Sequence, residues 1–173
     1  MKRLLSAALA PVLALAILAG AGSAEAQSYR NRVKIDQHGY GHGTALSQRG
    51  DRNGAVVTQE GFGHYSRGSQ DGYNNFLRMD QYGTRNSVTT GQRGENNLAV
   101  TGQEGTHLTA DTRQDGLGNT SGIAQIGDGH IASADQSGRN NASGIIQVGR
   151  GQEAHIVQHG DNNISVVVQS GWE

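Results

Sequence analysis

The sequence predicts an all-β fold, in which strand-turn-strand repeats of 22 residues stack into a cross-β solenoid of about six and a half rungs. Three observations lead to this prediction. A Gln-x-Gly motif recurs 13 times at a constant spacing of 11. Residue types alternate with period two between the motifs, as they do along a strand. The only proline, Pro11, precedes the repeats, so no proline interrupts a backbone ladder there.

The first 26 residues have the three-part pattern of a secretory signal peptide. A basic start is followed by an apolar run over residues 4–19 and by small residues before a cleavage site after Ala26. A membrane anchor is the alternative, but Pro11 interrupts a run shorter than the roughly 18 apolar residues that a spanning helix needs. We therefore expect a signal peptide at 1–26 and export to the cell exterior.

The composition of the remaining chain excludes several classes of protein. Without residues 1–26 the chain has 12 basic and 14 acidic residues, whereas binding to nucleic acid needs a basic surplus. It has no cysteine, so neither disulfides nor a cysteine metal site can stabilise it. Polar and small residues dominate, which on composition alone would predict disorder. Any order must therefore come from repetition.

The repeated glutamine defines the lattice of the fold. Because loops accept insertions easily, a spacing of 11 without any insertion indicates that every copy occupies an equivalent position. We divide the chain into a short N-terminal segment with the first strand at 27–36 and a repeat region at 37–173. The glutamines expected to form a stacking ladder are Gln37, Gln48, Gln59, Gln70, Gln81, Gln92, Gln103, Gln114, Gln125, Gln136, Gln147, Gln158 and Gln169.

The fifth position after each glutamine shows that the true period is twice the spacing of the motifs. One alternating set is always asparagine and is expected to form a second ladder: Asn53, Asn75, Asn97, Asn119, Asn141 and Asn163. The other set is variable and contains His42, His64, Asn86, Leu108, His130 and Gln152. The two halves of a repeat therefore have different surroundings.

The residues between motifs alternate as in a strand. Asn53, Ala55, Val57 and Gln59 are predicted to point inward, and the residues between them outward. An 11-residue period is also compatible with a right-handed coiled coil, but a glycine in every copy costs about 1 kcal/mol relative to alanine in a helix. The pattern therefore favours strands.

Short polar stretches that contain glycine, such as residues 48–53, are predicted to form the turns between strands. The expected turn glycines are Gly39, Gly50, Gly61, Gly72, Gly83, Gly94, Gly105, Gly116, Gly127, Gly138, Gly149, Gly160 and Gly171.

An amide side chain at the same point of every rung can bond the identical amide above and below it. Each such bond is worth only about 1 kcal/mol net, but an unpaired buried amide costs about 1–3 kcal/mol. A core of this kind favours perfect register. The alternative is a disordered tract with solvated amides, but such tracts do not keep a fixed residue count.

The repeats resemble those of the curlin family, with the pattern Ser-x5-Gln-x-Gly-x-x-Asn-x-Ala-x3-Gln. Residues 48–59 and 92–103 match its second part, and the resemblance covers residues 37–171. The family's serine position is never serine here, so a major fibre subunit and a minor nucleating subunit both stay open. The resemblance implies an amyloid fibre subunit on a bacterial surface, acting in adhesion and biofilm. It also implies assembly with itself, a second curlin-type subunit, and export through an outer-membrane pore.

Other classes of function find less support in the sequence. The carboxylates are scattered through predicted turns and outward positions, so we expect no enzyme, cofactor or small-molecule substrate. A soluble, capped β-solenoid that binds ice or carbohydrate is the alternative, but Thr90, Thr101 and Thr112 are predicted to point inward. His42, His64 and His130 share one face, with too few ligands for zinc, and are interpreted as hydrogen-bonding side chains without a metal.

Overall fold

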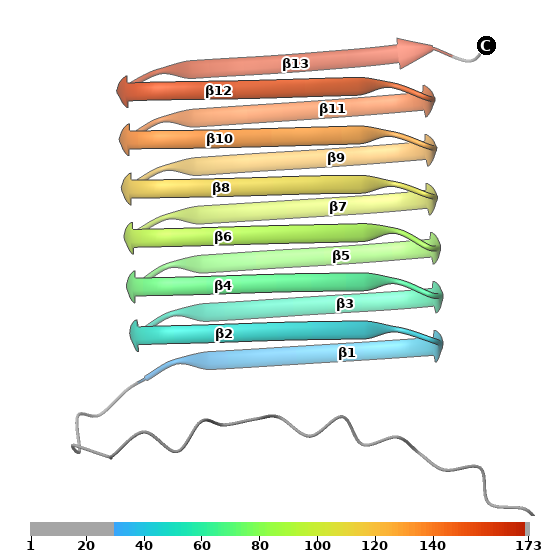
Figure 1. Ribbon diagram of the computed structural model, residues 1–173, viewed down its shortest axis with the longest axis horizontal. Coiled ribbons are helices and arrows are strands. Elements are labelled where there is room, and N and C mark those ends of the chain that lie inside the picture. Colours follow the sequence, from blue (N-terminus) through green and yellow to red (C-terminus); the bar gives the residue numbers. More distant parts are fainter. Residues whose placement is uncertain (1–29, 172–173) are drawn as a thin grey trace, which may run out of the picture.

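The computed structural model describes residues 30–171, and these residues form a two-sheet β-solenoid (Figure 1). The predicted signal peptide at 1–26 lies outside them. The strands are β1 (Arg32–Tyr40), β2 (Gly43–Asp51), β3 (Gly54–Phe62), β4 (Tyr65–Tyr73), β5 (Phe76–Thr84), β6 (Ser87–Glu95), β7 (Leu98–Thr106), β8 (Thr109–Leu117), β9 (Thr120–Asp128), β10 (Ile131–Arg139), β11 (Ala142–Arg150), β12 (Glu153–Asp161) and β13 (Ile164–Gly171).

Odd-numbered strands form one sheet of seven and even-numbered strands form a second sheet of six. Each strand pairs in parallel with the strand two positions later, in a register that places every residue beside the one 22 positions away. Two consecutive strands therefore make one rung. The all-β solenoid with a 22-residue repeat is confirmed, and no helix of the described residues is long and apolar enough to span a membrane.

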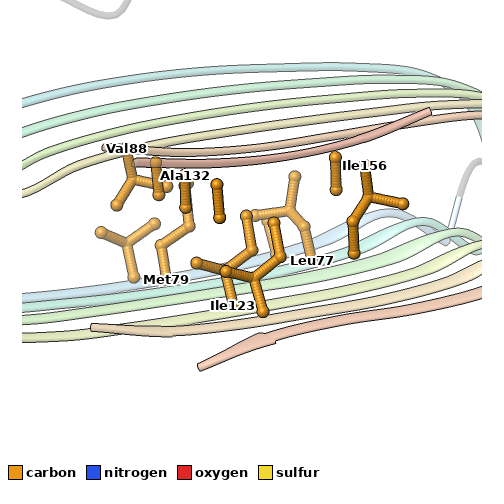
Figure 2. Close-up of a cluster of buried hydrophobic side chains, with 12 residues drawn as sticks. Leu77, Met79, Val88, Ile123, Ala132 and Ile156 are labelled. Carbon is orange, nitrogen blue, oxygen red and sulfur yellow. The ribbon is translucent and has the colours of Figure 1, made fainter. Parts of the chain in front are cut away.

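The core lies between the two sheets and follows from the alternation along each strand. In β3, Ala55, Val57 and Gln59 are at most 2% exposed, while the residues between them are only partly buried. Figure 2 shows larger side chains, among them Leu77, Met79 and Ile123, projecting into the same space from several strands. The apolar core is narrow, because alanines fill much of it and a column of buried glutamines from each sheet flanks it, one at either edge.

The turns are shorter than the sequence predicted. The sequence placed a turn over residues 48–53, but β2 continues to Asp51 and only Arg52 and Asn53 connect it to β3. The predicted turn glycines therefore pair within the strands, Gly50 next to Gly72 for example, with φ of +99° for Gly50. The ladder continues through them because the chain bends at each glycine without losing its partner in the next rung.

The first strand also differs in extent from the predicted segment 27–36. It begins at Arg32 and runs to Tyr40, in full register with β3. Asn31 already joins the lattice, since its side-chain oxygen accepts the Asn53 backbone N–H at 2.9 Å. The repeat pattern in the structure thus starts before Gln37.

Candidate functional site

The glutamine side chains of each sheet form a continuous chain of hydrogen bonds along the stack. Gln81 Nε2 donates to Gln103 Oε1 at 3.0 Å, and Gln103 Nε2 donates to Gln125 Oε1 at 2.8 Å. In the other sheet, Gln92 Nε2 donates to Gln114 Oε1 at 2.9 Å. The same donor-to-acceptor direction holds for every consecutive pair from Gln37 to Gln169 and from Gln48 to Gln158.

The second N–H of each amide joins the two sheets, a contact that sequence reasoning missed. Gln103 Nε2 in β7 donates to the Ser87 carbonyl of β6 at 3.1 Å, and Gln114 Nε2 in β8 donates to the Leu98 carbonyl of β7 at 3.0 Å. A buried amide has two donors and needs a partner for each. The glutamines therefore fix the spacing of the sheets as well as their register.

The asparagine set closes the turns. Asn97 Nδ2 donates to the Arg93 carbonyl at 3.1 Å and to the Gly116 carbonyl at 3.0 Å. Its backbone N–H and its Nδ2 both reach Asn75 Oδ1, at 3.1 Å. One side chain thus ties its own turn to the rungs on both sides. Asn53, Asn75, Asn119 and Asn141, like Asn97, are buried, and Asn163 occupies the same position in the last turn.

Histidine takes over this role at the opposite turn. His64 Nε2 lies 3.0 Å from the Glu60 carbonyl, and its Nδ1 lies 3.2 Å from the Asn86 backbone N–H. These two bonds require the neutral tautomer with the proton on Nε2. His130 makes the equivalent contacts to Ile126 and Gln152. Among the residues of this column, Leu108 has no polar group and interrupts it.

The rings of His42 and His64 stack, with centroids 5.1 Å apart and planes 5° from parallel. Burial lowers the pKa of His64 below its ordinary value of 6.5, the Glu60 carbonyl opposes this, and the charge of His42 adds to it. The site therefore favours the neutral form of His64. Within residues 30–171 no group of three or more His, Cys, Asp or Glu side chains could hold a metal ion.

The glycine column is a second constraint on composition. A Cβ at Gly105, which has φ of +137°, would lie 1.9 Å from the carbonyl oxygen of Gly127. Real Cβ atoms do not approach a backbone oxygen so closely, and side chains rarely adopt this φ. By contrast, Gly102 in the same strand has an ordinary φ and open space around it. Within β7, the repeated glycine is thus required by geometry and Gly102 is not.

The outer faces of both sheets carry apolar and charged side chains, and the seven-stranded sheet has the Arg78–Asp80 ion pair on its outer face. On the seven-stranded sheet, the outward residues include large apolar side chains such as Val100, Ile126 and Ile146, which are 39%, 46% and 43% exposed. The outward side chains of the six-stranded sheet include charged residues, such as Arg93 beside Asp115.

The threonines that bear on the ice-binding alternative lie in the interior. Thr90, Thr101 and Thr112 are each at most 2% exposed, so their predicted inward orientation is confirmed. They form no outward ladder that could contact ice.

Among residues 30–171, the outermost strands at the two ends of the stack have a paired neighbour on one side only. At one end β1 exposes Val33 and Ile35, which are 50% and 43% exposed although they belong to inward columns. At the other end β13 exposes Ile164, Val166 and Val168. Open strand edges with apolar residues are templates for pairing with another chain.

Comparison with protein families identifies the curlin associated repeat at residues 50–83 and again at 83–116. The prediction of curlin repeats is thereby confirmed, and strands outside these residues continue the same register. The family is one of structural amyloid subunits and implies extracellular fibres. No curated protein and no solved structure matches the chain.

Proposed function

Because the chain carries curlin repeats on a β-solenoid, we propose that it is a secreted structural subunit of a curli-like amyloid fibre on a bacterial surface. The fibre would act in adhesion and in the biofilm matrix. The observation that carries the proposal is the directional amide ladder, which runs through both sheets and is open at both ends of the stack.

The direction of the ladder supports growth from head to tail. Each glutamine donates to the residue 22 positions later, so Gln158 and Gln169 have no such acceptor within the described chain. At the other end, Gln37 and Gln48 have no glutamine 22 positions earlier to donate to their Oε1 atoms. One end therefore offers amide donors and the other amide acceptors, and a second copy fits in one polarity only.

Burial at the ends supports the same mechanism. Val33 and Ile35 lie in core columns but are about half exposed, so a further rung at that end would remove them from water. Added parallel strands would also pair the backbone N–H and C=O groups of the outermost strands. We propose in addition export through the signal peptide and an outer-membrane pore, and assembly with a second curlin-type subunit.

The test is assembly of the purified mature protein, residues 27–173, without other components. We expect fibres that seed their own growth and that diffract with spacings of about 4.7–4.8 Å and about 10 Å. A lasting, folded, soluble monomer would refute the proposal and favour a soluble solenoid that binds ice or carbohydrate. The buried threonines, and the apolar residues exposed at both ends of the described stack, weigh against that alternative.

A further inference from the structure

The number of strands in the described chain is odd. Residues 30–171 form 13 strands, seven in one sheet and six in the other, so β1 and β13 are both outermost strands of the same sheet. Figure 1 shows this: β1 ends the stack at one side and β13 at the other, and each lies half a rung beyond the nearest strand of the second sheet. A stack with such ends can receive a second copy in two ways.

In the first way the second copy keeps the orientation of the first, and its β1 pairs with β13. The six-stranded sheets then do not meet, because β12 and the second copy's β2 lie two strand spacings apart, about 9.6 Å. The backbone groups on both sides of this gap would have no partner inside the fibre. Since an unpaired buried backbone group is costly, each junction would carry a defect.

In the second way the second copy is rotated by half a turn about the fibre axis. Its β1 then pairs with β12 and its β2 with β13, all in parallel, and no strand position stays empty. We infer that successive copies in the fibre are related by this half turn, so that the seven-stranded sheet of one copy continues into the six-stranded sheet of the next. The inference rests on the proposed fibre function and specifies how the subunits meet.

Side chains at the junction fit the half turn better. We keep the register in which every glutamine pairs with a glutamine. The exposed Val166 of β13 then meets Ala45 of the next copy, whereas without rotation it would meet Lys34. Ile164 likewise meets a glycine in place of Arg32. The apolar outward residues of β13 thus extend over small uncharged ones, while Asp36 lies beside a valine in either arrangement.

The other strand of the junction adds a charge pair. With the half turn, Glu153 of β12 lies beside Arg32 of the next copy, and opposite charges on adjacent strands stabilise pairing. The inward residues continue the core, since Ile156 meets Ile35 and Gln158 meets Gln37. Without rotation Glu153 would face a glycine across the gap. Strand number, apolar matching and charge therefore agree.

Four double-cysteine variants test the inference, because the chain has no cysteine of its own. With the half turn, Asp36 lies beside Val157 of a neighbouring copy and Ser47 beside Val168. Without it, Asp36 lies beside Val168, and Ser47 faces Val157 across the gap. In-register neighbours are about 4.8 Å apart, within the range of about 4.4–6.8 Å that a disulfide spans. The two residues of each pair lie at opposite ends of one chain, so a disulfide between them joins two copies.

Fibres of Asp36→Cys/Val157→Cys and of Ser47→Cys/Val168→Cys should give covalent oligomers on mild oxidation, seen as a ladder on denaturing gels. Fibres of Asp36→Cys/Val168→Cys and Ser47→Cys/Val157→Cys should stay monomeric on the same gels. Cross-linking of the Asp36→Cys/Val168→Cys fibres alone, which stacking without rotation predicts, overturns the half turn, and so do fibres in which no variant cross-links. Failure of the unmodified chain to form fibres refutes the proposed function, and the inference with it.

Helical reconstruction of unmodified fibres by electron cryo-microscopy gives a second measurement that needs no variant. The half turn predicts a rotation of about 180° and a rise of about 31 Å per subunit, from 6.5 rungs of about 4.8 Å. Stacking without rotation predicts a rotation near zero and a rise of about 34 Å, from seven strand spacings in the larger sheet. The second outcome would overturn the inference even if fibres form readily.

Discussion

Replacement of Gln103 by leucine removes one link of the amide ladder at the centre of the stack. Gln103 is 1% exposed and makes three side-chain hydrogen bonds, to Gln81, Gln125 and the Ser87 carbonyl. Leucine leaves one N–H of Gln81 and the Oε1 of Gln125 without that partner, at about 2 kcal/mol for each buried group. Burial of the leucine side chain offsets about 2 kcal/mol of this loss. The net destabilisation is therefore about 2 kcal/mol.

The concentration of soluble protein left at equilibrium with fibres measures this change. A loss of about 2 kcal/mol should raise the residual concentration of Gln103→Leu roughly 30-fold over that of the unmodified chain. Arg93→Leu is the matched control, since it introduces the same side chain at an exposed site with only a long 3.9 Å contact to Asp115. Exposed ion pairs are worth about 0–1 kcal/mol, so this variant should change the concentration by no more than about fivefold. Equal residual concentrations, or equal growth rates of seeded fibres, would refute the role assigned to the ladder.

Three further predictions concern the histidines, the glycines and the end of the stack. The pKa of His64 is lowered in the fold, so its neutral form contributes fully to the free energy of unfolding above pH 6.5. This contribution should be lost as the pH falls through the lowered pKa. The denaturant midpoint should therefore drop between pH 7.5 and 5. A His42→Asn, His64→Asn variant should show a smaller drop, and an identical pH profile would contradict the stacking argument. Gly105→Ala should destabilise fibres by at least about 1–3 kcal/mol through its strained φ, and the clash of the new Cβ with the Gly127 carbonyl oxygen adds to this. In the same denaturation assay, Gly102→Ala should be neutral or stabilising by up to about 1 kcal/mol. A synthetic peptide of residues 152–173 should form fibres with a shorter lag time, and seed the full chain better, than a peptide of residues 64–85. The strands of the second peptide contain Gly68 and Arg78, which weaken β-strand formation. Comparable lag times and seeding would show that strand composition does not determine the nucleation site.

The constant spacing in the sequence was sufficient to predict the sheets, the register and the inward residues. Because side chains alternate with period two and the motifs keep a constant spacing, Val57 must point to the same side as Gln59. In the structure both side chains are buried on the inner face of β3. The spacing also predicted that side chains at equivalent positions of successive repeats would be neighbours, as Gln37 and Gln59 are.

The contacts between the sheets could not be predicted in the same way. Which carbonyl faces Gln103 Nε2 depends on how the chain winds from one sheet to the other, and the spacing of motifs does not contain this information. The sequence did contain a signal for the role of Asn97 in closing a turn. Each asparagine of its set lies at the third position after a glycine, and a side chain so placed can bond a turn carbonyl. The glycines were assigned to turns because glycine usually marks turns, whereas here Gly105 is required by the close approach of Gly127 inside the ladder.

The two-residue turns bear on how such a gene can change over generations. With only Arg52 and Asn53 between β2 and β3, the chain has no loop there that would absorb an insertion of arbitrary size. Changes of length that keep the register of the glutamines come in blocks of 11 codons, the kind that slippage or unequal recombination between similar repeats produces. One duplicated block turns an odd number of strands into an even one, so that successive subunits would then all face the same way. A single recombination event would thereby rearrange the whole exterior of the fibre while leaving every existing codon unaltered.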